Sequence, residues 1–270
     1  MALLVTLAGC SSPGAAEPSA APTSARIGAS VVVPPSAPAV SSPVPVPTPE
    51  PPPPAPAPVV VLDPGHNGGN AAHPEVVNAQ VPDGAGGTKP CNTTGTETDA
   101  GYPEHAFTWD VALRMRDKLT AAGVQVVLTR QDDAGVGPCV DARGRLSAQV
   151  GAAAFVGIHG DGAAASGRGF HVITSSLAPA GAQVAADSTT LAAAVRDAMT
   201  AVEPVSTYTG SNGLDPRRDL AGLNLNEVPA IYVECGNMRN ATDAALMSNT
   251  GGRDRIATQL TAGVLTFLGR

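Results

Sequence analysis

Basic residues are scarce in this chain of 270 residues. Lys and Arg number 16 against 23 Asp and Glu, which gives a formal net charge of −7. No stretch gathers enough positive charge to follow a phosphate backbone or an anionic lipid surface. We therefore expect no nucleic-acid partner.

Long apolar runs and Cys-x-x-Cys motifs are also missing. Beyond the N-terminus no segment approaches 18 uninterrupted apolar residues, so we expect no transmembrane helix. The four cysteines form no Cys-x-x-Cys pair, which argues against a zinc site built from cysteine. No internal repeat and no second globular module are apparent in the sequence. We expect the protein to be a monomer.

The sequence of the N-terminus predicts an export signal. Residues 1–10 are apolar and end in Leu7-Ala8-Gly9-Cys10, which resembles the lipobox of bacterial lipoproteins, where the cysteine is lipidated after cleavage. The alternative is an ordinary signal peptide with a chance cysteine. Both interpretations predict an exported protein of the cell envelope or periplasm, and lipidation of Cys10 would anchor it to the membrane.

Residues 11–58 differ in composition from the rest of the chain. From residue 34 to residue 58 nearly every position is Pro, Ala, Val or Ser. Such a segment cannot bury enough apolar surface to offset the entropy of ordering it, and it favours extended polyproline II structure. We predict a disordered tether here and one folded domain over residues 59–270.

Within residues 59–270, predicted strands alternate with predicted helices. The expected strands cover residues 59–63, 124–129, 153–159, 169–174 and 230–234. The expected helices cover residues 104–122, 141–151, 181–202, 241–247 and 254–267. This order predicts a single α/β domain whose mainly parallel, twisted sheet has helices on both faces. The active site of such a fold lies at the carboxyl ends of the strands.

Three polar residues fall at those predicted strand ends. His66 follows an apolar run in a Pro-Gly turn, His159 ends a second run, and Glu234 follows a third. Neutral imidazole is among the commonest zinc ligands. A carboxylate just beyond a buried strand is costly unless it is paired or functional, so Glu234 is a candidate general base.

Glu104, the first residue of the long predicted helix, is the candidate third ligand. Two histidines and one glutamate with an open position are typical of a catalytic zinc ion. The alternative is a first-turn carboxylate that only complements the helix dipole. His105 is the rival ligand.

Five further polar residues are expected to have structural roles. His171 lies within a predicted strand, and Asp63 precedes Pro64, where it could hold the turn or partner His66. Arg143 on a predicted helix is expected at the surface or in a salt bridge. Asn237 and Asn240 are expected to cap the turn and helix after the last strand.

The motifs together resemble a known family. They are VVLDPGHNGG, Glu104 leading into VALRMRDKL, GVQVVLTRQDD, AAAFVGIHGDG and NEVPAIYVECGNMRNATDAALM. In this order they resemble the zinc-dependent N-acetylmuramoyl-L-alanine amidases of the Amidase_3 type, over essentially all of residues 59–270. The chain is also similar to the short mycobacterial members that carry no wall-binding module.

The resemblance implies a peptidoglycan hydrolase in which His66, Glu104 and His159 bind Zn²⁺ and Glu234 is the catalytic acid/base. The bond implied is the amide between N-acetylmuramic acid and L-alanine of the stem peptide. Residues 78–99 enlarge one loop relative to the common family pattern, which leaves the substrate preference open. The alternatives are a zinc peptidase acting within the stem peptide and an inactive envelope binding lipoprotein.

We also predict a disulfide between Cys91 and Cys139. Both residues follow the carboxyl ends of predicted parallel strands, so their loops share one edge of the sheet. Export supplies the oxidising conditions that the bond needs. Two free loop thiols are the alternative. Cys235, at the end of an apolar strand, is expected to be buried and unreactive.

Overall fold

The structure is a computed structural model that describes residues 28, 30–32 and 56–270. The signal-like segment, Cys10 and most of the predicted tether lie outside the described residues. Within the described part of the chain, no helix is long and apolar enough to cross a membrane.

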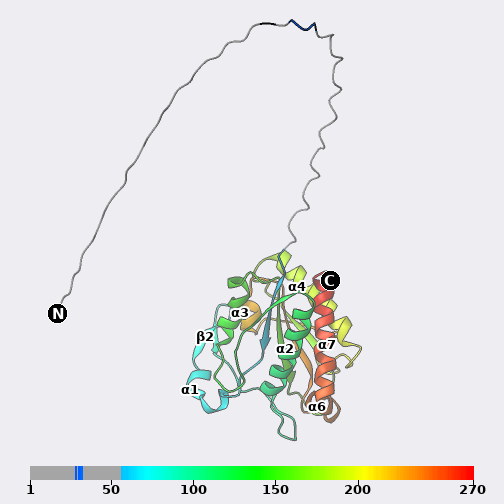
Figure 1. Ribbon diagram of the computed structural model, residues 1–270. Coiled ribbons are helices and arrows are strands. Elements are labelled where there is room, and N and C mark those ends of the chain that lie inside the picture. The colour runs from blue at the N-terminus through cyan, green and yellow to red at the C-terminus, as the bar shows by residue number, and fades with distance from the viewer. Residues whose placement is uncertain (1–27, 29, 33–55) are drawn as a thin grey trace, which may run out of the picture. The chain divides into compact units, whose positions relative to one another are not determined.

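A six-stranded sheet in the order β4-β1-β5-β8-β6-β7 forms the centre of the domain (Figure 1). Its strands are β1 (Val59–Pro64), β4 (Gln125–Leu128), β5 (Ala154–Asp161), β6 (His171–Ser175), β7 (Leu214–Arg217) and β8 (Ala230–Asn237). Neighbouring strands are parallel except β6 and β8, which are antiparallel. The predicted α/β class with a mainly parallel sheet is confirmed.

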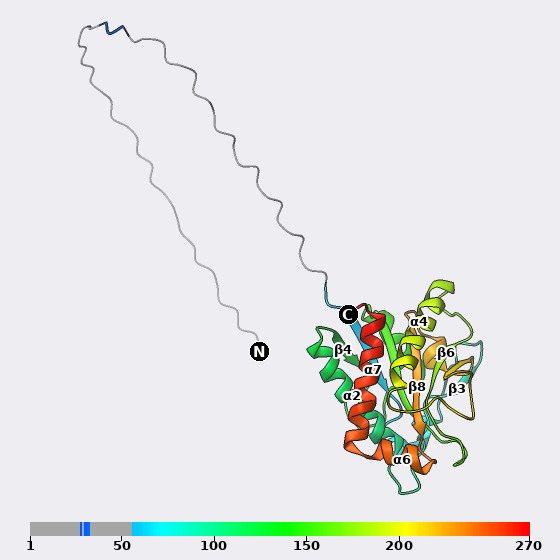
Figure 2. The same cartoon turned by 90° about the vertical axis from the view of Figure 1, so that its right-hand side faces the viewer.

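Helices cover both faces of this sheet. They are α2 (Glu104–Ala121), α3 (Val140–Gln149), α4 (Ala182–Met199), α5 (Ala221–Asn224), α6 (Ala241–Ser248) and α7 (Thr250–Phe267). The apolar residues of α2, α4 and α7 pack on one face, and those of α3 and α5 pack on the other. Figure 2 shows α2 and α7 side by side in front of the strands.

Strand β1 shows why its sequence is a continuous apolar run. Val60 and Leu62 join the core beneath α2, whereas Val61 joins the core on the opposite face, and all three are fully buried. A strand buried on both faces cannot alternate apolar with polar residues. Burial of each such side chain stabilises the fold by about 1.5–3 kcal/mol, so β1 is a rigid support for the turn that follows it.

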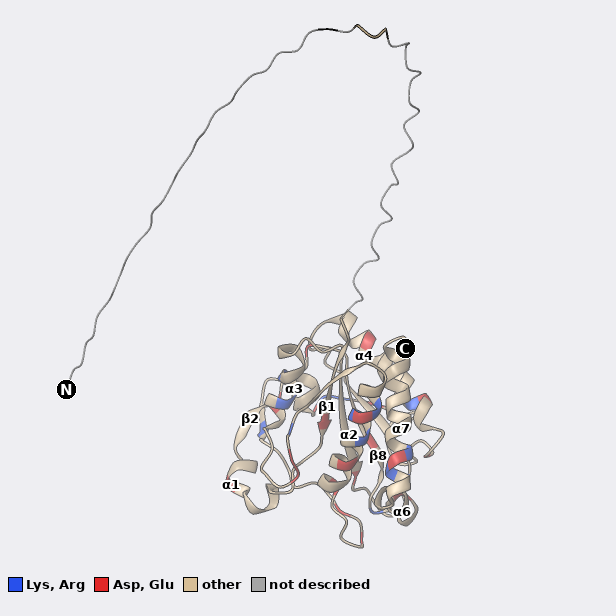
Figure 3. Ribbon diagram, viewed as in Figure 1, with Lys and Arg blue, Asp and Glu red and all other residues tan. Residues whose placement is uncertain are grey.

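Charged residues connect α2 to α7 on the outer surface (Figure 3). Asp110 of α2 pairs with Arg114 and with Arg253 of α7, and Asp254 pairs with Lys118. These side chains are partly exposed, so each pair contributes at most about 1 kcal/mol. The apolar contacts between the helices therefore provide most of their attraction.

The enlarged segment before Glu104 forms a small hairpin that we did not predict. After a 3-10 turn (η1, Asn70–Ala72) and α1 (Pro74–Val77), strands β2 (Gln80–Pro82) and β3 (Thr88–Pro90) pair in antiparallel register. Asn224 of α5 donates a hydrogen bond from its side chain to the backbone oxygen of Asp83 over 3.0 Å. The hairpin is thereby tied to the rest of the domain.

A disulfide joins Cys91 to Cys139 in the structure, with 4.4 Å between their Cα atoms. The backbone N–H of Val140 also donates to the oxygen of Cys91 over 2.8 Å. The bond connects the end of the hairpin segment to the start of α3. Cys235 is buried as a free thiol in the apolar core, as predicted.

Candidate active site

Three neighbouring strands bring the predicted site residues to one edge of the sheet. His66 lies two residues after the end of β1, His159 lies in β5, and Glu234 lies in β8. His159 and Glu234 stand opposite each other in the parallel register of β5 and β8. Glu104 is the first residue of α2, the helix that packs on one face of the sheet.

The carboxylate of Glu104 lies between the two histidines. Its Oε1 is 3.0 Å from Nε2 of His66 and 3.0 Å from Nδ1 of His159. One ligand atom from each of these three residues lies within 4.8 Å of the others. His105 instead directs Nδ1 to the carboxylate of Asp133 at 2.9 Å, so its place as the rival ligand is not supported.

The donor set fits a zinc ion. Two histidine nitrogens and one carboxylate oxygen can all approach a metal at about 2 Å when they surround one point. The Nδ1–H of His66 donates to the backbone oxygen of Thr93 over 3.1 Å, which directs Nε2 toward Glu104. Histidine ligands normally have such a second partner, because it sets the tautomer and the ring orientation.

Glu104 is held in its ionised form. Its Oε2 accepts from the backbone N–H of Thr96 at 2.9 Å, and its Oε1 accepts from that of Gly160 at 3.1 Å. Burial alone would raise the pKa of Glu104, but the charges of His66 and His159 and their hydrogen bonds to its carboxylate hold the pKa far below its ordinary value. Glu104 in turn raises the pKa of His66 against the opposite effect of burial.

Two glycines allow this close approach. A Cβ atom on Gly65 would lie 2.3 Å from Cε1 of His159, and one on Gly95 would lie 2.8 Å from Oε2 of Glu104. His66 itself has a φ of 61°, which is unusual for a residue with a side chain. Such backbone strain persists only where the surrounding structure enforces it.

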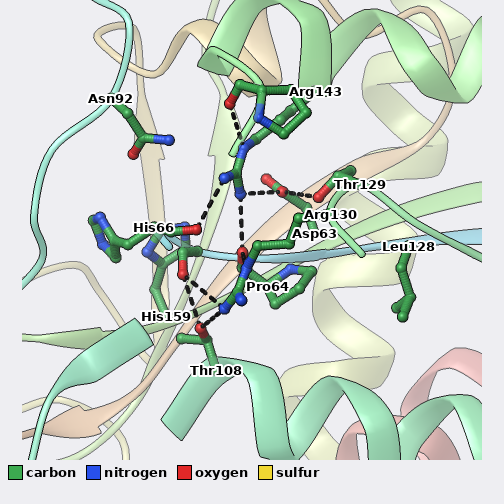
Figure 4. A network of polar contacts seen from close by, with 12 residues as sticks. Asp63, Pro64, His66, Asn92, Thr108, Leu128, Thr129, Arg130, Arg143 and His159 are labelled. Carbon is green, nitrogen blue, oxygen red and sulfur yellow. Dashed lines mark hydrogen bonds and ion pairs between the residues drawn. The ribbon is translucent and has the colours of Figure 1, made fainter. Parts of the chain in front are cut away.

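Two buried arginines enforce the turn that carries His66 (Figure 4). Nη1 of Arg143 donates to the oxygen of Pro64 at 2.9 Å, and Nη2 donates to that of His66 at 2.9 Å. Nε of Arg130 also donates to the oxygen of Pro64, at 3.0 Å. Arg143 forms an ion pair with Asp63 at 3.0 Å. Its predicted salt bridge is present, but a surface position is wrong, because its side chain is 2% exposed.

Asp63 supports the turn through Arg143. Burial would raise the pKa of Asp63, but the Arg143 charge and the hydroxyl of Thr129 hold it below its ordinary value. The ring of His66 contacts Thr93 rather than Asp63. The structure therefore places Asp63 behind the ligand turn, which was one of its two predicted roles.

Glu234 lies beside the candidate metal centre with an unused oxygen. Its Oε2 is buried and has no hydrogen-bond partner among the described residues. Burial and the negative charges of Glu104 and Asp161 raise the pKa of Glu234 well above its ordinary value. A carboxylate that is ready to take up a proton is suited to acid–base catalysis.

The remaining residues for which we predicted structural roles lie in strand β6, in the turn after β8 and at the start of α6. His171 is buried in β6, opposite Glu234 in register. The side chain of Asn240 accepts from the backbone N–H groups of Thr242 and Asp243 and caps α6, as predicted. Asn237 accepts from the N–H of Arg239 in the turn.

A cleft of about 370 Å³ contains the site. Besides His66, His159 and Glu234, it is lined by Lys89 of β3 and Arg217 of β7. Sequence reasoning missed these two cations, because only the fold brings the hairpin beside the edge strand.

Comparison with known proteins gives a consistent result. The family model for N-acetylmuramoyl-L-alanine amidase (Amidase_3) matches residues 60–266. N-acetylmuramoyl-L-alanine amidase Rv3717 of Mycobacterium tuberculosis is 48% identical over 211 residues, which cover 78% of this chain and 86% of that protein.

Solved structures of similar proteins share the fold. The N-acetylmuramyl-L-alanine amidase Ami1 from Mycobacterium smegmatis superimposes with a TM-score of 0.75 at 47% identity, covering 79% of this chain and 98% of Ami1. The apo form of Ami1 from Mycobacterium abscessus superimposes with a TM-score of 0.75 at 45% identity, covering 79% and 100%.

Proposed function

Because the chain belongs to the N-acetylmuramoyl-L-alanine amidase family, we propose that it is a zinc-dependent member whose ligands are His66, Glu104 and His159. It is a peptidoglycan amidase, and the bond it cleaves joins N-acetylmuramic acid to L-alanine of the stem peptide. The observation that carries the zinc assignment is the convergence of the three ligand atoms within 4.8 Å.

Zinc bound at this position would polarise the amide carbonyl and lower the pKa of a bound water toward about 7. Residues of the protein would then transfer the proton. The free Oε2 of Glu234 takes a proton from the attacking water and returns it to the leaving amine of alanine. Its raised pKa favours the first of these transfers. The hydrogen bonds from Thr96 and Gly160 keep Glu104 in place during these proton transfers.

The products of digestion test this proposal. Purified protein is incubated with muropeptides, and the products are identified by mass spectrometry. We expect intact stem peptides with a free alanine amine. Cleavage within the stem peptide would instead establish the peptidase alternative, and an absence of cleavage by zinc-loaded protein would favour the inactive binding lipoprotein.

We further propose that Cys10 is lipidated and that residues 11–58 tether the domain to the membrane. The support is the lipobox-like segment and the proline-rich composition. The 25 residues from 34 to 58 would span up to about 80 Å in extended form. Acyl groups should be found on Cys10 of membrane-associated protein, and Cys10→Ala should release the protein. Recovery of unacylated protein free of membrane would overturn the anchor.

A further inference from the structure

One segment of the chain contacts two of the three proposed zinc ligands. Residues 92–96 form this segment, which we call the support segment. The backbone oxygen of Thr93 accepts from Nδ1 of His66 over 3.1 Å. The backbone N–H of Thr96 donates to Oε2 of Glu104 over 2.9 Å, and its backbone oxygen accepts from the N–H of Glu104 over 2.9 Å. A shift of the support segment would therefore move the ring of His66 and the carboxylate of Glu104.

The support segment lacks the backbone ladder of a helix or a strand. Residues 92–96 belong to neither kind of element. Among the described residues, the oxygen of Thr93 accepts from only two groups, Nδ1 of His66 and Nδ2 of Asn70, the second over 2.8 Å. A carbonyl oxygen has two lone pairs, so one serves His66 and the other is occupied by Asn70. The direction of this carbonyl thus depends on a side chain rather than on regular secondary structure.

Asn70 is anchored to the turn that carries His66. It is the first residue of η1 and is 1% exposed, and its backbone N–H donates to the oxygen of Asn67 over 3.1 Å. Asn67 is the residue that follows His66 in the sequence. The contacts therefore close a ring, because the side chains of His66 and Asn70 start from the same turn and meet at the oxygen of Thr93.

The side-chain amide of Asn70 makes only part of the hydrogen bonds that it could make. Its Oδ1 is buried and has no hydrogen-bond partner among the described residues. An unpaired buried polar atom destabilises a fold, so an apolar side chain of similar size would suit this position better if it only had to be filled. The hydrogen bond that Nδ2 donates to Thr93 is therefore the feature that explains an amide here.

We propose that Asn70 is a positioning residue for the zinc site. By holding the oxygen of Thr93, it fixes the ring of His66 with Nε2 directed toward the metal position, and it thereby raises the affinity of the site for zinc. The inference rests on the proposed function, because it takes the zinc ligands from it. Partners of metal-binding histidines change metal affinity by about 10–100-fold, and since Asn70 acts through one intervening carbonyl, we expect the lower end of this range.

The test measures zinc affinity separately from catalysis. Full-length wild type and Asn70→Leu are freed of metal with a chelator, and the apoproteins are titrated with zinc. We expect the Kd for zinc to be about tenfold higher in Asn70→Leu, because leucine cannot donate to the oxygen of Thr93. Saturating zinc should restore most of kcat in this variant, since the three ligands and Glu234 are unaltered.

Asn226→Leu is the matched control. Asn226 is also 1% exposed, but its Oδ1 accepts from the hydroxyl of Ser147 over 2.7 Å, so the same substitution removes a buried amide that bonds to α3. Urea unfolding of the apoproteins measures the loss of stability in each variant. Only Asn70→Leu should also lose zinc affinity.

The outcomes separate this inference from the zinc site itself. An unchanged Kd in folded Asn70→Leu, or an equal rise in Asn226→Leu, would overturn the positioning role and leave the ligands as assigned. Wild-type protein that binds no zinc would overturn the proposed zinc site and the inference with it. Asn70→Ala is measured in parallel, because it removes the same donor without adding bulk. If both Asn70 variants fail to fold, Asn70 supports the fold as a whole and the positioning role is wrong.

Discussion

Buried polar side chains around the turn after β1 use their hydrogen-bonding groups in two different ways. Behind His66, Arg130 and Arg143 hold the turn and donate to the carboxylate of Asp63 and to backbone oxygens. In the cleft in front of His66, Glu234 keeps a buried oxygen without a partner among the described residues. Buried polar atoms are nearly always paired. This contrast separates a supporting network, which contains Arg143, from a reactive group, Glu234. It predicts that the network controls the free energy of unfolding and that Glu234 controls the rate of catalysis.

The largest expected effect is on rate, in Glu234→Gln. We expect kcat to fall by roughly 10²–10⁴-fold, because the amide side chain cannot accept the proton. The free energy of unfolding should not fall, since the substitution removes a buried charge that is repelled by Glu104. Steady-state kinetics and urea unfolding measure the two effects. Glu227→Gln, an exposed acid just before β8, is the control. Near-normal turnover of the Glu234 variant would remove it from catalysis.

The next effect is on stability, in Arg143→Met. This change leaves Asp63 as an uncompensated buried charge and removes donors from the turn that carries His66. We expect a loss of about 3–5 kcal/mol in the free energy of unfolding. Arg145→Met, an exposed residue two positions along the same helix, should change it little. Equal stabilities in the two variants would show that the network behind the turn is not needed for the fold.

Reduction of the Cys91–Cys139 disulfide should have a smaller effect. Its 48-residue separation corresponds to at most about 4 kcal/mol in the chain-entropy model, and measured values are often lower. The bond anchors the hairpin that carries Lys89, which lines the cleft. Reduction should therefore weaken substrate binding, measured as a higher KM, more than it weakens zinc binding. The Cys235→Ala protein is the control, because it lacks the buried free thiol but keeps the Cys91–Cys139 disulfide. If non-reduced peptide maps show Cys91 and Cys139 unlinked, the bond itself is absent.

The smallest effect concerns pH. The pKa of Asp63 is lower in the folded protein than its ordinary value, so its contribution to stability is fully present above about pH 4 and is lost as the pH falls through the folded pKa. Urea unfolding at a series of acidic pH values measures this loss. The Arg143→Met variant should lose less stability over that range than the wild type. An unchanged pH dependence would mean that Asp63 is not the group responsible.

The same contrast shows what could be predicted from the sequence. Strands β1, β5 and β8 are apolar runs that end in polar residues, so their order and the positions of His66, His159 and Glu234 could be predicted. Strand β7 carries Pro216 and two charged residues; it lies at the sheet edge, where such a sequence is tolerated. Its apolar pattern was too weak to predict.

The supporting network was beyond prediction for a different reason. Two partners of Arg143 are backbone oxygens that lie 77 and 79 residues away in the sequence, and a backbone oxygen has no sequence signature. Lys89 and Arg217 are likewise brought together only by the hairpin and the sheet edge. Sequence patterns indicated the residues in front of the turn, whereas the long-range contacts behind it required the structure.

Zinc content tests the central claim most directly. Metal analysis of the wild type, His159→Ala and Glu234→Gln should give about one zinc ion per chain for the first and third proteins and a large loss for the second, because His159 is a proposed ligand and Glu234 is not. Stoichiometric, tightly bound zinc in His159→Ala, or loss of zinc in Glu234→Gln, would contradict the site as assigned.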